Sequence, residues 1–183
     1  MEKYNVRIEG TRPLLMHSCN SMLEQSNNKT TRSKDHDPQK EAETALYTDK
    51  DGVIVVPSFS VLSCLRGSAV NFQVPGKGKK TYKNFIYAGL KIEAENILLE
   101  SDAGYEVDLK TVVVQRSRIV RARPRFDDWA LEFVIEIVDT IITPDALKQI
   151  IEDAGKFNGL LDFRPLYGLF KLTTFEKIAD EEA

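Results

Sequence analysis

Two well-marked helix starts, each lying between stretches of strand-like alternation, constrain the fold of this chain more than any other feature. Ser58 is a suitable N-cap, and apolar residues at spacings of three and four after it predict a helix over residues 59–72. Residues 143–145, Thr-Pro-Asp, combine an N-cap, a first-turn proline and an acid that suits the helix dipole. They predict a second helix over residues 144–154, with Gly155 as its C-terminal stop.

Four strands are predicted around these helices. The first has the period of two of a half-buried strand, and the aspartate pair at residues 127 and 128 predicts a hairpin between the second and the third. The predicted strands are residues 4–9, 112–123, 129–139 and 166–176. The resulting β-α-β-β-α-β order is that of an α+β, ferredoxin-like fold, in which two helices cover one face of a four-stranded antiparallel sheet.

The length of 183 residues suits one domain with insertions, and a hydrophobic content of 42% excludes a disordered chain. We expect residues 1–183 to form a single domain from which two segments depart. Residues 20–44 hold only three apolar residues, so we expect a mobile polar insertion without essential chemistry. Residues 73–110 are expected to be a strand-rich insertion that carries an exposed basic loop at residues 75–83.

Several classes of protein are excluded by what the chain lacks. No apolar run approaches the roughly 18 residues that a membrane-spanning helix requires, and the amino terminus does not read as a secretory signal. We therefore expect a cytoplasmic protein with no membrane partner. Cys19 and Cys64 are too few for a disulfide framework and are not spaced as a metal site, so we expect two reduced thiols. The net charge of −3 does not by itself indicate a nucleic-acid binder, so the distribution of charge must decide.

Two dense basic clusters are the main candidates for a binding site. Such clusters neutralise phosphates and release counterions, and neighbouring aromatic rings stack on bases. The candidate nucleic-acid-binding residues are Arg116, Arg118, Arg121, Arg123 and Arg125 in the predicted second strand, Lys77, Lys79, Lys80 and Lys83 in the basic loop, and Arg164 and Tyr167 before the last strand, with Phe126 and Tyr82 as further aromatic partners.

The placement of the arginines leaves two interpretations open. On an extended strand the first two of the five share one face and the last three the other, so one flat patch needs a bulge or bend, for which Pro124 is a suitable break. The alternative is a solvated hairpin in which the arginines pair with the carboxylates at residues 127, 128, 132 and 136. Arg164 likewise either reaches a phosphate or base edge, or closes its own turn by pairing with Asp162 or Asp153.

Residues 57–66 read Pro-Ser-Phe-Ser-Val-Leu-Ser-Cys-Leu-Arg. This segment resembles the proline-serine start of the first helix, ending in Leu-Arg, of the repeat-associated mysterious protein superfamily, whose members include the backbone subunits of CRISPR effector complexes. Residues 155–170 lie between second helix and last strand, where the superfamily carries its glycine-rich loop. One departure is that residues 159–161 read Gly-Leu-Leu where a second glycine is expected, so the backbone is less free to wrap a phosphate.

Two further motifs are Pro-Leu-Leu-Met-His at residues 13–17 and an Arg-x-Arg-Pro-x-Phe-x-x-Trp segment at residues 121–129. In both motifs the chain resembles a family of uncharacterised phage and prophage proteins. This resemblance covers most of the chain, whereas the superfamily resemblance rests on topology and two loops. It implies a phage or prophage origin.

Catalytic candidates are few. Asp35, His36 and Asp37 have the residue types for metal binding or acid–base chemistry, but their polar setting offers no groups to fix a metal's geometry, so we interpret them as a solvated loop. They are retained because in some superfamily members an acidic residue after the first strand cuts RNA. His17 is interpreted as a packed histidine. The chain has no phosphate loop, nucleophile elbow or zinc spacing, so we assign no catalytic residue, cofactor or metal.

Three functions from different classes follow. The first is a noncatalytic binder of single-stranded RNA or DNA, with RNA favoured, built like a CRISPR backbone subunit and self-associating as those do. The second is a phage protein that uses the same fold to engage a host or viral protein, for instance as a decoy for a defence complex. The third is a metal-dependent ribonuclease. No RNA-recognition-motif signature lies on the predicted strands, so stacking of bases on the sheet face is not supported. We expect one binding surface formed by Arg121, Arg123 and Arg125, the basic loop around Lys79 and Lys80, and the Arg164 turn, because in a ferredoxin-like topology the loop before the last strand can converge with elements that extend from the second strand.

Overall fold

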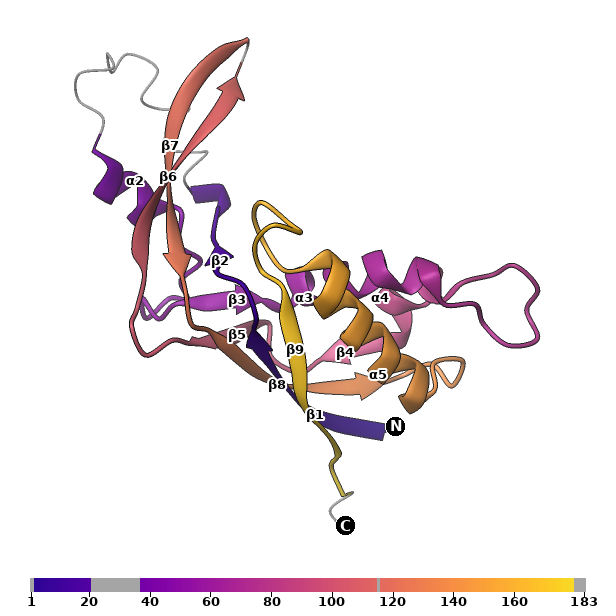
Figure 1. Ribbon diagram of the computed structural model, residues 1–183. Helices are drawn as coiled ribbons and strands as arrows, with labels where there is room; N and C mark the ends of the chain where they lie inside the picture. The colour runs from indigo at the N-terminus through magenta and orange to yellow at the C-terminus, as the bar shows by residue number, and fades with distance from the viewer. Residues whose placement is uncertain (1, 21–36, 115, 180–183) are drawn as a thin grey trace.

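Figure 1 shows the computed structural model, which describes residues 2–20, 37–114 and 116–179. Within this part of the chain, the main sheet has six strands in the order β3-β5-β8-β1-β9, with β4 paired to β8 off this path. These strands are β1 (Glu2–Gly10), β3 (Val55–Pro57), β4 (Leu90–Ile92), β5 (Asn96–Glu100), β8 (Ala130–Ile137) and β9 (Phe170–Lys177). β1 pairs with both β8 and β9 in antiparallel register, so residues 4–9 and 129–139 share one sheet, as predicted.

Helices α3 (Ser58–Ser68) and α5 (Pro144–Asp153) lie on one side of the main sheet (Figure 1). The inward residues of β1 alternate along the strand, as the period of two predicts, and the apolar side of α5 packs in the same core. The residues that meet there include Tyr4, Val6 and Ile8 of β1 and Leu147, Ile150 and Ile151 of α5. This arrangement of two helices on an antiparallel sheet confirms the α+β, ferredoxin-like prediction.

The two helix starts differ in how they are capped. The Thr143 hydroxyl accepts a hydrogen bond from the Ala146 amide at 3.3 Å, which confirms it as the N-cap of α5. Ser58 is instead the first residue inside α3, and no side chain caps that helix, so the predicted Ser58 cap is wrong. The Ser58 amide donates to the Glu95 carbonyl at 2.9 Å, so a neighbouring loop satisfies it.

The predicted stop at Gly155 is also wrong. The chain continues past α5 as a π-helical turn, η4 (Ala154–Asn158), and the left-handed residue that ends it is Gly159, with φ of 74°. Gly155 serves a different purpose, because a Cβ there would lie 2.3 Å from the Phe170 carbonyl oxygen. The glycine lets the turn pack directly against β9.

The predicted hairpin between residues 112–123 and 129–139 is not formed. β7 (Ser117–Phe126) pairs with β6 (Glu106–Val114) and with β2 (Leu14–Leu15) in a separate three-stranded sheet. The turn at residues 127 and 128 is a corner between the two sheets, held by the Asp128 carboxylate, which accepts from the Asp102 amide at 2.9 Å. The β6–β7 hairpin therefore projects away from the core (Figure 1).

The second core strand comes from the segment expected to be an excursion. β4 and β5 both lie within residues 73–110, and each pairs with β8 in the place assigned to residues 112–123. The basic loop before them is exposed at residues 75–80, as predicted. Before this loop, η2 (Ala69–Asn71) extends α3. After it, the chain passes through η3 (Tyr82–Asn84) and α4 (Ile86–Gly89) into β4.

Part of the predicted polar insertion is helical. Residues 38–44 form α2 (Pro38–Thr44), and residues 21–36 lie outside the described residues, so the expected mobility of residues 20–44 stays a prediction. The Asp37 carboxylate caps α2 by accepting from the amides of Gln39 and Lys40, at 3.0 and 3.3 Å. Ala42 is buried, so one small apolar residue anchors an otherwise polar helix.

Ion pairs cover the face of the main sheet that the helices leave open. Arg7 on β1 pairs with Glu100 of β5 at 2.7 Å and with Glu132 of β8 at 3.2 Å, and Lys3 pairs with Glu93. On the part of this face that the structure describes, these charges are already matched in pairs, in line with the missing RNA-recognition-motif signature. Among the described residues, no helix is both long and apolar enough to cross a membrane.

Candidate nucleic-acid interface

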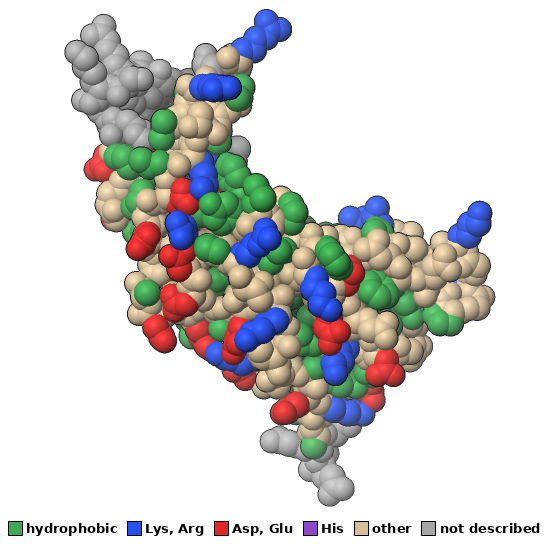
Figure 2. Space-filling view, viewed as in Figure 1, with side chains coloured by type: hydrophobic (Ala, Val, Ile, Leu, Met, Phe, Trp, Pro, Cys, Tyr) green, Lys and Arg blue, Asp and Glu red, His purple; other side chains and the backbone are tan. Residues whose placement is uncertain are grey.

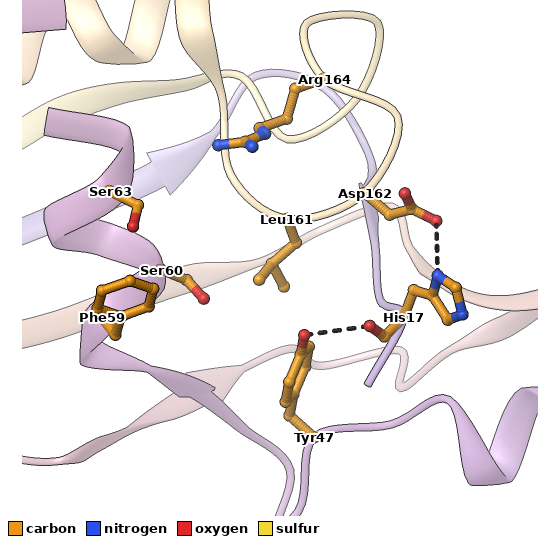
Figure 3. Close-up of a pocket in the computed structure, with 8 residues that line it drawn as sticks. All are labelled: His17, Tyr47, Phe59, Ser60, Ser63, Leu161, Asp162 and Arg164. Atoms are coloured by element: carbon orange, nitrogen blue, oxygen red, sulfur yellow. Dashed lines mark hydrogen bonds and ion pairs between the residues drawn. The ribbon is translucent and has the colours of Figure 1, made fainter. Parts of the chain in front are cut away.

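A crevice of about 270 Å³ opens between α3 and the 159–168 loop, which joins η4 to β9 (Figure 3). Its lining comes from four parts of the chain, namely Phe59, Ser60 and Ser63 of α3, Leu161, Asp162 and Arg164 of the loop, His17 after β2, and Tyr47 after α2. The Tyr47 hydroxyl donates to the His17 carbonyl at 3.1 Å and so joins two of these segments. We call this space the first crevice.

A second crevice, of about 340 Å³, lies beside the first. One side of its lining consists of Phe157, Asn158 and Pro165. The other side comes from α3 and includes Cys64 and Gly67. Ser63 and Arg164 line both crevices, so Arg164 stands where the two meet. In Figure 3 its side chain reaches from the loop toward Ser63 on α3.

Arg164 is exposed, and no ion pair or hydrogen bond to its guanidinium comes from any residue that the structure describes. The pairing expected with Asp162 or Asp153 is not formed. Asp162 binds Arg123, and Asp153 accepts from Ser68 and from Asn71. The structure thus leaves Arg164 free to bind an external anion.

The loop that carries Arg164 is pinned by backbone hydrogen bonds. The Gly168 amide donates to the Pro13 carbonyl at 2.8 Å, and the Asp162 amide donates to the Leu15 carbonyl at 3.1 Å. Leu161, in the Gly-Leu-Leu stretch where a second glycine was expected, takes the left-handed φ of 59°. The backbone therefore adopts a glycine-like turn despite the leucine, with the strain that such a φ costs a larger residue.

His17, Arg123 and Asp162 form a cluster at the end of the first crevice. The Arg123 Nε atom lies 3.1 Å from the Asp162 carboxylate, and one of its terminal nitrogens lies 3.3 Å from His17 Nδ1. Because a guanidinium only donates, His17 Nδ1 must accept, which places the proton of the neutral ring on Nε2. Burial, followed by the charge of Arg123, lowers the pKa of His17 below its ordinary 6.5. His17 is half-buried between charged groups, so the expectation of a packed histidine holds only in part.

Exposed aromatic rings flank the two crevices. Phe59 is 65% exposed beside the first, and Phe157 is 66% exposed beside the second. Phe59 stacks on Tyr87 with ring centroids 5.6 Å apart, and the Arg66 guanidinium lies 5.1 Å from the centre of the Tyr87 ring. These rings expose the stacking surfaces that unpaired bases use.

The five arginines of the predicted second strand have separate surroundings. Arg116 lies in the β6–β7 turn with φ of 67°, and Arg118 is exposed. Arg121 pairs with Glu41 at 3.2 Å, and Arg125 pairs with Asp127 at 2.7 Å. Arg123 is only 4% exposed, so burial corrects its assignment as a phosphate contact. Of the four carboxylates proposed as partners, Asp127 alone forms such a pair among the described residues.

The register of the hairpin explains why these arginines do not form one patch. β6 and β7 pair without interruption from Glu106–Arg125 to Val114–Ser117, so the bulge expected at Pro124 is absent from the described pairing. Strand alternation then keeps Arg118 on the face opposite to the arginines at residues 121, 123 and 125. The last three point toward α2, the 159–168 loop and the corner at residue 127.

The lysines of the basic loop lie at the other end of the molecule. Lys77, Lys79, Lys80 and Lys83 are exposed, and Lys77 lies 6.0 Å from the centre of the Phe85 ring. Figure 2 shows Lys and Arg side chains at the hairpin tip and over this loop, with the outline of the molecule hollowed between them. In Figure 1 the 159–168 loop lies in that interval. We call this side of the molecule the concave edge.

The predicted aromatic partners are already engaged or buried. The Lys110 ammonium donates to the Tyr167 hydroxyl at 2.6 Å and lies 4.7 Å from the centre of its ring. Tyr82 is 3% exposed and Phe126 is 1% exposed, so burial corrects both as stacking partners. Sequence analysis missed Phe59 and Phe157, which line the crevices, and Tyr87, on which Phe59 stacks. The signal for Phe59 was its place on α3 outside the stripe of apolar residues that faces the core.

The catalytic candidates gain no support from the described residues. Asp37 caps α2, and Asp35 and His36 lie outside the described part of the chain. No group of three or more His, Cys, Asp or Glu among the described residues is placed to hold a metal ion. Cys19 and Cys64 are both free thiols. Burial raises the pKa of Cys64 to about 12, and its thiol donates to the Gly159 carbonyl.

Neither a family model nor a curated protein matches this chain. Among solved structures, the fold is similar to that of a chain in the cryo-EM structure of the type III-B Cmr-beta bound to cognate target RNA, with a TM-score of 0.55 and 14% sequence identity. The match covers 97% of this chain and 60% of that chain, so this chain spans about 60% of the length of the structure it matches. At this identity the likeness shows the fold alone.

Proposed function

We propose that this chain is a noncatalytic binding protein for single-stranded nucleic acid, with RNA as its ligand, acting in the cytoplasm. The observation that carries the proposal is Arg164, an exposed guanidinium without an ion-pair or hydrogen-bond partner among the described residues, placed where two crevices meet. A planar guanidinium in such a position suits a phosphate, which it binds through two parallel hydrogen bonds.

The charges along the concave edge support a ligand longer than one nucleotide. Exposed cations stand at both ends of this edge, with Arg116 and Arg118 on the hairpin and Lys77, Lys79, Lys80 and Lys83 on the basic loop. The main sheet instead carries paired charges, which favour neither sign of ligand. We propose that a single strand of nucleic acid lies along the concave edge and contacts Arg164 near the middle of this edge. Arg121 and Arg123 instead stabilise the fold through their ion pairs.

RNA is favoured over DNA by likeness to a chain in a structure that holds target RNA, although that likeness shows the fold alone. A role alongside partner chains, in a CRISPR-related complex, is part of the same proposal, because the structural neighbour is a chain of the type III-B Cmr-beta. A phage or prophage origin is proposed from the motifs at residues 13–17 and 121–129. We also propose that the chain self-associates, as CRISPR backbone subunits do.

The proposal is tested by measuring the affinity for a single-stranded RNA of about 30 nucleotides at low salt, where phosphate contacts are strongest. Arg164→Ala is expected to weaken binding about tenfold, as loss of one well-formed phosphate contact does. The matched control is Lys91→Ala, which removes the same charge from β4 on the open face of the main sheet. An equal effect of the two variants would show that only net charge matters. No binding by the unmodified chain would favour the protein-interaction function instead.

A further inference from the structure

The two crevices share a similar arrangement next to Arg164. Each has an exposed phenylalanine at its border, Phe59 in the first and Phe157 in the second, and each includes Ser63 and Arg164 in its lining. The two rings come from different elements, α3 and η4, so their pairing across the arginine is a property of the fold and not of one local motif.

The Phe59 ring is supported from behind. It stacks on Tyr87 with an angle of 29° between the ring planes, and the Tyr87 hydroxyl lies 3.0 Å from the Ser63 hydroxyl. Arg66 adds a cation against the Tyr87 ring. A ring fixed in this way loses little side-chain freedom when a further ring stacks on it, which favours binding of a planar group.

The charge at the junction specifies what links two such planar groups. Asp162 is the carboxylate of the first crevice, and Arg123 at 3.1 Å and His17 at 3.8 Å already accompany it. Arg164 therefore supplies an unmatched positive charge between the two rings. In a single strand of RNA, one phosphate lies between each pair of successive bases.

We infer that the two crevices hold two successive unpaired nucleotides, with one base stacked on Phe59, the next on Phe157, and the phosphate between them bound by Arg164. The hydroxyls of Ser60 and Ser63 line the first crevice, where they suit hydrogen bonds to a base edge or a ribose hydroxyl. This inference rests on the proposed function and adds to it a two-nucleotide subsite. The subsite requires bases for stacking but does not discriminate between the four bases.

The test compares two polymers of about 30 residues, an oligouridylate and an abasic ribose-phosphate chain of equal length and charge. The unmodified protein is expected to bind the oligouridylate about 100-fold more tightly, since each stacked base contributes about tenfold. Phe59→Ala and Phe157→Ala should each reduce that preference about tenfold, and the double variant should bind both polymers equally. Leu98→Ala, which removes a comparably exposed apolar side chain from β5, should keep the full preference.

The outcomes separate this inference from the proposed function. Equal binding of both polymers by the unmodified protein would overturn the two-base subsite and leave phosphate binding intact. A full preference in both phenylalanine variants would also overturn it, because the bases would then stack elsewhere. No binding of either polymer would overturn the proposed function together with the subsite. Thermal unfolding of each variant verifies that these exposed substitutions leave the fold unchanged.

Discussion

Arg123 and Arg164 show how the same residue type serves two purposes within one small region. Arg123 on β7 is buried and forms an ion pair with Asp162 of the 159–168 loop. Arg164, two residues after Asp162 in the same loop, is exposed and has no such partner among the described residues. Both looked alike in the sequence, as arginines near aromatic residues. Burial could not be read from strand alternation there, because it depends on the 159–168 loop folding over β7.

Substituting each arginine by alanine should separate stability from binding. Arg123→Ala should lower the free energy of unfolding by about 2 kcal/mol, because it removes charge-assisted hydrogen bonds and leaves Asp162 with less compensation. Arg164→Ala should change it by less than about 0.5 kcal/mol, as is usual for exposed residues. Urea denaturation measures both. Equal losses of stability would contradict the distinction between the two arginines.

The pKa of His17 predicts a specific dependence of stability on pH. Burial and Arg123 lower this pKa in the folded chain below the ordinary 6.5, while the nearby carboxylates of Asp162 and Glu41 act in the opposite direction. The folded state therefore binds fewer protons than the unfolded state as pH falls below 6.5, so stability decreases with falling pH until the folded-state pKa is passed. Well above pH 6.5, by about one pH unit or more, the ring is essentially neutral in both states and contributes almost no slope.

His17→Gln should remove that part of the pH dependence. The measurement is the difference in free energy of unfolding between the unmodified chain and the variant, followed from pH 7.5 to pH 5.5, the range around and below the ordinary pKa of about 6.5. The difference should be constant at the upper end and change toward the lower end, in favour of the variant. A difference that stays constant throughout would show that His17 keeps an ordinary pKa.

At the scale of secondary structure, helices were easier to predict than strand partners. Thr143 and Pro144 mark the start of α5 through local chemistry, and the structure has the helix there. The pairing partner of β7 depends on the direction in which the chain leaves this strand. Asp127 and Asp128 were interpreted as a hairpin turn, but they form a corner between the two sheets. The true hairpin, β6–β7, closes through residues without a typical turn sequence, so local signals could not identify it.

Two glycines allow a test of how tightly the 159–168 loop is held. Gly168 and Gly76 share a φ of 73°, but a Cβ at residue 168 would lie 2.1 Å from the Leu160 carbonyl oxygen, whereas residue 76 has open space around it. Gly76→Ala should lower the free energy of unfolding by about 1 kcal/mol, the cost of a left-handed backbone. Gly168→Ala should lower it by about 1–3 kcal/mol more, because the loop must shift. Equal thermal shifts would mean that the loop yields without cost.

At the scale of the molecule, the α+β fold followed from the order of elements, but the convergence of basic residues did not. The sequence placed three basic groups in one surface, whereas the structure distributes exposed cations along the concave edge and turns Arg121 and Arg123 inward. That difference arises because the hairpin leaves the core sheet, and its arginines then meet Glu41 and Asp162 from distant parts of the chain. Such long-range partners carry no local sequence signal.

The two ends of the concave edge should contribute equally to the salt dependence of binding. The double variants Arg116→Ala with Arg118→Ala, and Lys79→Ala with Lys80→Ala, should each reduce the slope of log affinity against log salt by about 1.4, or 0.7 for each lost phosphate contact on a single strand. Lys91→Ala with Lys148→Ala removes two exposed lysines outside this edge and should leave the slope unchanged. A change in slope at only one end would confine the ligand to that end.

The central claim, that this chain binds single-stranded RNA along its concave edge, is tested most directly by a salt titration of the unmodified protein with one RNA of about 30 nucleotides. We expect association at low salt, with log affinity falling linearly as log salt rises and a slope that reflects several phosphate contacts at about −0.7 each. No association at the lowest salt concentration would contradict the claim.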